Sequence, residues 1–73
     1  MIECNEIEPF LNKYIAVGVP HNIMAGKLFF YYGVLKYVDN LEIKLETNNG
    51  FKIIPIINIR DIHEPRREYG NNR

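Results

Sequence analysis

The chain has 73 residues, nine basic and nine acidic side chains, and a formal net charge of zero. This length predicts a single domain that buries a modest share of its surface, so a partner subunit is the expected extra support. Cys4 is the only cysteine, which excludes an intrachain disulfide, and Cys4 with the distant His21 and His63 does not have the ligand spacing of a zinc site. A neutral chain is atypical of proteins that coat nucleic acid nonspecifically, although it is compatible with a local binding site. We expect a homo-oligomer with no metal and no other cofactor.

The start of the chain does not have the basic and then apolar order of a signal peptide. No apolar run approaches the roughly 20 residues that cross a bilayer. A cytoplasmic protein without a membrane partner is therefore expected. The domain is predicted to cover residues 1–63, and residues 64–73, in which Arg, Asn, Gly and Pro are frequent, are predicted to form a polar, frayed tail.

The N-terminal segment is predicted to contain a single helical turn at residues 9–13, because Pro9 is tolerated at the first turn of a helix. Cys4 is interpreted as a small apolar residue rather than a reactive thiol, since no basic residue is next to it. Residues 14–19 predict the first strand, because β-branched residues are dense there and Pro20 ends the run.

Residues 20–27 are predicted to form a loop that is rich in turn residues. His21 in this loop has no Ser, Cys or acidic residue beside it, which favours a loop residue over a catalytic base. Residues 28–38 predict one long strand that exceeds the usual length of about six residues, and Gly33 is the expected bend. The aromatic run at residues 29–32 occupies both faces of this strand. Packing against the core or another subunit is the favoured interpretation, and stacking on nucleic-acid bases is the alternative.

Residues 41–47 alternate between apolar and charged side chains and predict a third strand. Residues directly opposite one another in an antiparallel pair share a face, so the loop before this strand can be chosen by matching charges. A three-residue loop at residues 38–40 is predicted, because it sets Lys36 opposite Glu42 on the outer face and leaves apolar residues paired on the inner face.

The same test predicts a three-residue loop at residues 48–50, with Gly50 in the left-handed conformation, because this loop sets Glu46 opposite Lys52. In this register the following strand points one set of side chains inward, namely Phe51, Ile53 and Pro55. Ile54 and Ile56 then point outward. Exposed isoleucines on one strand invite a partner, so Ile54 and Ile56 are the predicted oligomer interface.

The fourth strand is predicted to end near residue 56, because Pro55 lacks a backbone donor. A short fifth strand is predicted at about residues 58–63, with Ile59 and Ile62 as core residues. The chain is therefore predicted to be mostly β: a small, strongly bent, antiparallel barrel of five strands with a short N-terminal helical segment.

The segment Gly33-Val34-Leu35-Lys36-Tyr37-Val38-Asp39 contains Gly-x-Leu, three further residues and then Asp. With a helical turn and five strands, of which the second is long and bent, this segment resembles the first motif of the Sm-like family, including its bacterial Hfq branch. The resemblance covers residues 9–63. Ile43 occupies the place of the family's Asn, and no Arg-Gly precedes Ile59. The resemblance implies a ring in which the fourth strand of one subunit pairs with the fifth strand of the next.

The resemblance also implies RNA binding near the turn after the second strand and near the last strand. Tyr37 is expected to stack on a base, Asp39 lies in the same turn, Asn40 or Asn58 is expected to bind a base edge, and Arg60 is expected to reach a phosphate. The alternative is local: Asp39 and Asn40 are ordinary turn residues, and Arg60 has acidic neighbours with which to pair.

No phosphate loop, nucleophile–base pair or metal spacing is present in the sequence, so no catalytic residue and no small-molecule substrate are expected. The favoured function is a non-catalytic Sm-like module that self-assembles into a ring and binds RNA. The alternative is an SH3-like protein-interaction module that binds a protein partner through an exposed apolar strand.

Overall fold

The computed structural model describes residues 2–65, so Arg66, Arg67 and most of the predicted tail lie outside the described residues. Its elements in chain order are the helix α1 (Cys4–Ile7), the 3-10 helix η1 (Glu8–Phe10), β1 (Tyr14–Pro20), β2 (Leu28–Val38), β3 (Glu42–Thr47), β4 (Gly50–Pro55), the 3-10 helix η2 (Ile56–Asn58) and β5 (Asp61–His63).

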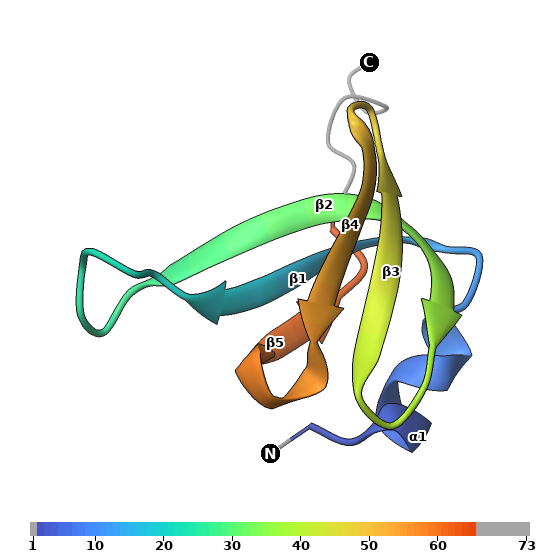
Figure 1. Cartoon of the computed structure of the whole chain (residues 1–73), viewed down its shortest axis with the longest axis horizontal. Helices are drawn as coiled ribbons and strands as arrows, with labels where there is room; N and C mark the ends of the chain where they lie inside the picture. The colour runs from blue at the N-terminus through green and yellow to red at the C-terminus, as the bar shows by residue number, and fades with distance from the viewer. Residues whose placement is uncertain (1, 66–73) are drawn as a thin grey trace.

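The five strands form one antiparallel sheet in the order β4-β3-β2-β1-β5 (Figure 1). The predicted mostly β class, with five antiparallel strands and a short N-terminal helix, is confirmed. The sheet is open, because β4 and β5 are its two edges and share no ladder. The described part of the chain therefore does not show the closed barrel that the sequence predicted.

The long strand β2 has the bounds predicted from the sequence. Its first part pairs with β1 and its second part with β3, and the strand curves between these two partners (Figure 1). A Cβ atom on Gly33 would lie 2.7 Å from the backbone carbonyl oxygen of Glu46 on β3. Glycine at the predicted bend therefore permits a close approach of two backbones that a side chain would obstruct.

The hairpin between β3 and β4 has the two-residue loop Asn48-Asn49, closed by Thr47 opposite Gly50. The predicted three-residue loop is therefore wrong. The Thr47 hydroxyl accepts a hydrogen bond from the Asn49 backbone N–H at 3.1 Å and donates one to the Gly50 carbonyl at 2.8 Å. These bonds hold the tight turn, and Gly50, with φ of 110°, becomes the first residue of β4.

This shift by one residue reverses the two faces of β4. Lys52 and Ile54 lie on the inner face, whereas Phe51 and Ile53 lie on the outer face. Ile54 is 2% exposed and Ile53 is 52% exposed. The predicted outward orientation of Ile54 and Ile56 is therefore wrong, because both side chains belong to the core. Burial of two isoleucines stabilises the fold by far more than the exposed ion pair that the predicted register would have formed.

The predicted register of the β2–β3 hairpin is also wrong. The ladder shifts at Lys36, and the Lys36 ammonium lies 3.8 Å from the Glu46 carboxylate instead of opposite Glu42. The Asp39 backbone N–H donates to the Glu42 carbonyl at 3.0 Å, and the Asp39 carboxylate accepts from the N–H groups of Leu41 and Glu42 at 2.8 and 2.9 Å. The chain therefore turns tightly after Asp39. Lys36 forms a bulge, because β2 has one residue more than β3 between the paired residues on either side of it.

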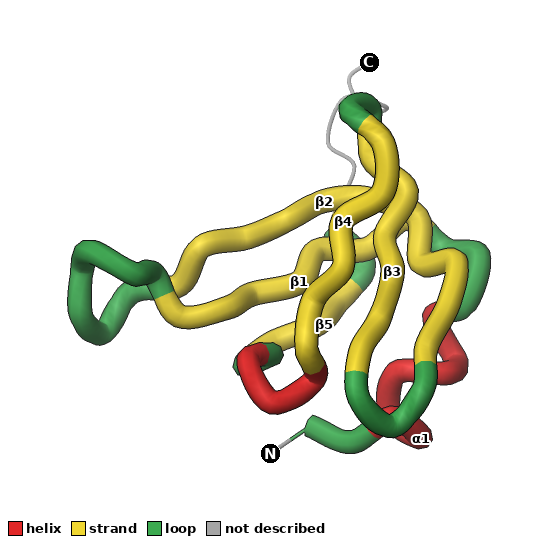
Figure 2. Tube along the Cα trace, in the orientation of Figure 1, coloured by secondary structure: helices red, strands yellow, loops and turns green. Residues whose placement is uncertain are grey.

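Both ends of the fold differ from the prediction in their bounds. The helical segment covers residues 4–10 rather than 9–13, and the Glu6 carboxylate accepts a hydrogen bond from the Glu3 backbone N–H at 3.1 Å near its start. Pro9 lies in the first turn of η1, as expected. At the other end, η2 occupies the beginning of the predicted fifth strand, so β5 has only three residues (Figure 2).

The core lies between the curved sheet, α1 and η2. Every strand except β5 contributes a fully packed apolar side chain, and the segment before β5 contributes Ile59. The buried cluster consists of Ile7, Ile15, Val17, Leu35, Ile43, Leu45, Ile54, Ile56 and Ile59. None of the helices between residues 2 and 65 has the length and apolar character needed to cross a membrane.

Candidate functional site

The turn between β2 and β3 holds three of the five predicted RNA-binding residues. The Tyr37 hydroxyl donates a hydrogen bond to Asp39 Oδ2 at 2.7 Å, and Asp39 Oδ1 accepts two backbone N–H groups of the turn. The Lys44 ammonium lies 5.1 Å from the centre of the Tyr37 ring. The Tyr37 ring is exposed to solvent, although contacts with a carboxylate and an ammonium group hold it in place.

The same contacts shift the pKa of both partners. The hydrogen bond to Asp39, and then the negative charge of Asp39, raise the pKa of Tyr37 above its ordinary value. The hydrogen bond from Tyr37, followed by the backbone donors Leu41 and Glu42, lowers the pKa of Asp39. Asp39 is therefore ionised at neutral pH, and Tyr37 remains protonated.

Asn40 is the third predicted residue in this turn. Its Oδ1 atom accepts a hydrogen bond from the thiol of Cys4 at 3.1 Å, which links the turn to α1. Cys4 also packs against the buried core, which agrees with its interpretation as a small apolar residue.

Asn58 and Arg60 lie apart from this turn. Arg60 Nη1 donates to the carbonyl of Ile57 at 2.8 Å, and the guanidinium borders a depression shared with Ile2 and Ile59. Asn58 borders a different pocket, between the end of β1 and β4. The structure thus brings Tyr37, Asp39 and Asn40 together and places Asn58 and Arg60 in two other locations.

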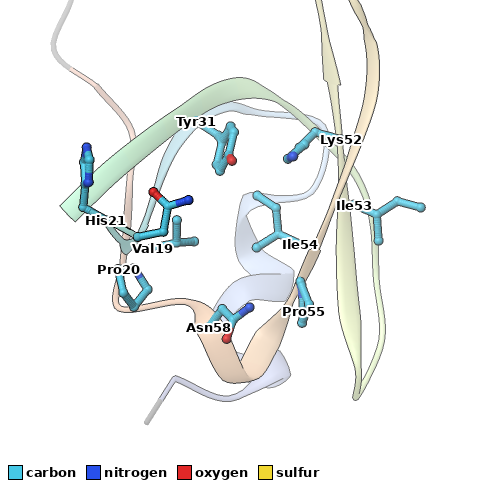
Figure 3. A pocket seen from close by; sticks show the side chains of 10 residues that line it. Val19, Pro20, His21, Tyr31, Lys52, Ile53, Ile54, Pro55 and Asn58 are labelled. Atoms are coloured by element: carbon cyan, nitrogen blue, oxygen red, sulfur yellow. The ribbon is translucent and has the colours of Figure 1, made fainter. Parts of the chain in front are cut away.

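The pocket that Asn58 borders was not predicted from the sequence. It has a volume of about 370 Å³ and lies between the end of β1, β2 and β4 (Figure 3). Its lining residues are Val19, Pro20, His21, Asn22, Tyr31, Lys52, Ile53, Ile54, Pro55 and Asn58. These residues are scattered from 19 to 58, and the predicted register placed Lys52 on the opposite face. Only the correct register of the β3–β4 hairpin would have placed Lys52 on the inner face, beside Tyr31.

His21 at the rim of this pocket orders the loop between β1 and β2. Its Nδ1 atom accepts hydrogen bonds from the backbone N–H groups of Ile23 and Met24, each at 3.1 Å, and its ring meets the edge of Phe29 with centroids 6.2 Å apart. This local role agrees with the prediction of a loop residue. Between residues 2 and 65, no group of three or more His, Cys, Asp or Glu side chains is placed to hold a metal ion.

The outer side of β4 carries exposed apolar side chains at an open edge of the sheet. Phe51 and Ile57 are each 65% exposed, and Ile53 lies between them in the chain with its side chain turned away from the pocket (Figure 3). Opposed residues in an antiparallel ladder alternate between pairs that exchange hydrogen bonds and pairs that do not. Pro55 has no N–H and lies opposite Glu42. These two residues therefore form a pair that does not exchange backbone hydrogen bonds. By alternation, the backbone groups of Phe51 and Ile53 point away from β3, toward the open edge.

No family model, curated protein sequence or solved structure gives a significant match to this chain. Its function has to be inferred from the geometry described above.

Proposed function

We propose that the chain is a non-catalytic Sm-like module that self-assembles into a ring through the edges of its sheet and binds RNA. The observation that carries this proposal is the open β4 edge, where unpaired backbone groups of Phe51 and Ile53 lie beside exposed apolar side chains. An open edge of this kind is a template for pairing with another strand, and natural proteins cover such edges.

The second edge of the sheet, β5, is the natural partner for β4. Among the described strands, β5 pairs only with β1, so its other side is open. Pairing of β4 with β5 of the next copy would satisfy both edges at once, as the Sm-like resemblance implies. Because the two edges differ, such a contact is head-to-tail, and it closes into a ring when the rotation between copies allows.

The interface in this proposal uses the outward residues of β4 and η2. Ile54 and Ile56 are core residues, so the apolar contact area comes from Phe51, Ile53 and Ile57. A small domain gains stability from covering such residues, because a chain of this size buries a limited part of its surface alone.

RNA binding in this proposal centres on Tyr37. Its ring is exposed and already held in place, so stacking on a base costs little side-chain ordering. Lys44 beside the ring supplies a cation near the phosphate backbone. Asn58 and Arg60 are secondary contacts, and a ring presents every such site several times, which increases the total affinity.

Solution mass, measured by size-exclusion chromatography with light scattering, tests the assembly. We expect a particle of several subunits, because head-to-tail contacts between copies close into a ring when the rotation allows. Ile53→Lys is expected to shift the particle toward monomer, because it introduces a charge at the interface. Leu41→Lys is the matched control, since Leu41 is an exposed apolar residue in the β2–β3 turn. If the wild-type chain is a monomer at all concentrations, the proposed ring is wrong.

The alternative is an SH3-like protein-interaction module, and the same exposed residues of β4 favour it. A neutral chain with exposed apolar side chains fits a protein partner as well as a second copy. Salt separates the two functions: binding of U-rich or A-rich RNA is expected to weaken steeply as salt rises, whereas an apolar protein contact is not.

A further inference from the structure

We propose that the pocket between β1, β2 and β4 binds a small organic anion with an apolar body. Its volume of about 370 Å³ falls at the small end of the range of about 300–1,000 Å³ typical of ligand pockets. Val19 and the buried Ile54 form apolar walls, and Pro20 and Pro55 add apolar surface at the rim. This site is independent of RNA binding and of assembly.

The charge of the lining selects an anion. The ten lining residues include one lysine and one histidine but no carboxylate. Lys52 lies opposite the buried Leu45, so its aliphatic stem follows the inner face of the sheet. Its ammonium group lies 4.7 Å from the centre of the Tyr31 ring, which holds the charge above the pocket. An ammonium group only donates hydrogen bonds, so its natural partner is an anionic oxygen.

Further polar side chains complete the lining. Tyr31, Lys52 and Ile54 project toward the same space, with Asn58 on the side of η2 (Figure 3). His21 Nδ1 accepts two backbone N–H groups, so the hydrogen of a neutral His21 ring resides on Nε2 and makes this atom a donor. A carboxylate ligand would therefore meet Lys52 first, while its apolar body lies against Val19 and Ile54.

The pocket also ties an edge strand to the rest of the fold. Four of its lining residues, 52–55, belong to β4, and the others come from β1, the following loop, β2 and η2. A bound ligand would connect β4 to β1 across the open side of the sheet. Ligand binding is therefore expected to raise the thermal stability of the chain, because only the folded state presents the site.

Titration with sodium benzoate, followed by two-dimensional ¹⁵N–¹H NMR, tests the site. We expect saturable shifts of Tyr31, Lys52, Ile54 and Asn58, and a rise in melting temperature. Benzamide has the same ring without the charge, and it is expected to bind at least about tenfold more weakly, the factor typical of one lost charge-assisted hydrogen bond. Inorganic phosphate, which has the charge without the apolar body, is expected to give no saturable shifts.

Lys52→Gln is expected to weaken benzoate binding by about tenfold for the same reason. Lys44→Gln is the matched control, because Lys44 also lies over a tyrosine ring but outside the pocket. Lys52→Arg keeps the charge and is expected to retain binding. If the Gln variant unfolds, the comparison of benzoate with benzamide on the wild-type chain still tests the role of the charge. Equal affinity for benzoate and benzamide, an unchanged affinity in Lys52→Gln, or no saturable shift with benzoate would overturn the proposal.

Discussion

The Tyr37 hydroxyl donates a hydrogen bond of 2.7 Å to the Asp39 carboxylate two residues later in the chain. This contact joins the end of β2 to the turn that sets the register of β3. It also moves the two pKa values in opposite directions, upward for Tyr37 and downward for Asp39. One exposed pair therefore contributes both to the hairpin geometry and to the electrostatics of the proposed RNA site.

Tyr37→Phe is expected to raise the pKa of Asp39 toward its ordinary value near 3.8, because the hydrogen bond from Tyr37 is the largest cause of the lowering. The pKa should stay somewhat below that value, since the backbone N–H groups of Leu41 and Glu42 still donate to the carboxylate. NMR titration of the Asp39 carboxyl carbon measures this shift. Tyr32→Phe is the control, and an identical Asp39 titration in both variants would contradict the assignment.

The stability of the chain is expected to fall in acid through Asp39. The pKa of Asp39 is lower in the folded state than in the unfolded state, so its contribution is fully present above about pH 4 and is lost as the pH falls through the folded value. Urea unfolding at several pH values measures this dependence. Asp39→Asn should be less stable than wild type at neutral pH, and the difference should shrink in acid. A difference that is constant with pH would exclude this linkage.

Substitution of two adjacent isoleucines tests the observed register of β4. Ile54→Ala is expected to destabilise the fold by about 2–5 kcal/mol, because Ile54 is almost fully buried. Ile53→Ala removes the same atoms from an exposed side chain and should cost less than about 1 kcal/mol in the monomer. Chemical denaturation of dilute protein measures both values. A larger loss of stability for Ile53→Ala than for Ile54→Ala would instead support the register predicted from charge matching.

Gly33→Ala is expected to destabilise the fold by about 1–3 kcal/mol, because the new Cβ atom would meet the backbone carbonyl of Glu46 on the neighbouring strand. Gly18→Ala is the informative comparison. Its Cβ atom would lie 2.8 Å from the ring of Phe30, and a side chain can move more easily than a backbone. Thermal unfolding of the two variants should therefore show the larger loss for Gly33→Ala, and an equal loss would count against a special role of Gly33 at the bend.

Tyr37→Ala is expected to weaken RNA binding by about 1–3 kcal/mol, the range found for one stacked base. Fluorescence anisotropy with short U-rich and A-rich RNAs measures the affinity. Tyr32→Ala is the matched control, because Tyr32 is also exposed but lies on β2 before the bend. Loss of affinity in the Tyr32 variant alone would move the RNA site to the aromatic surface of β2.

Most of the strands of this fold could be predicted from local sequence. The dense β-branched run ending at Pro20 marked β1, and the long aromatic strand had its observed bounds because loop residues lie on both sides of it. The β2–β3 turn was also visible, since Asp and Asn favour turns. These features depend on the conformational preferences of residues close together in the chain.

The registers of two hairpins, and with them the faces of β4, were decided only by the tertiary structure. Ile53 and Ile54 are chemically identical neighbours, so no local pattern distinguishes the inward one from the outward one. The distinction arises from the Thr47 and Asp39 hydrogen bonds that shorten the turns and from the core that receives Ile54. Because side chains alternate with a period of two, a slip of one residue exchanges core and surface. That exchange placed Lys52 beside Tyr31 and created a pocket that the linear sequence does not reveal.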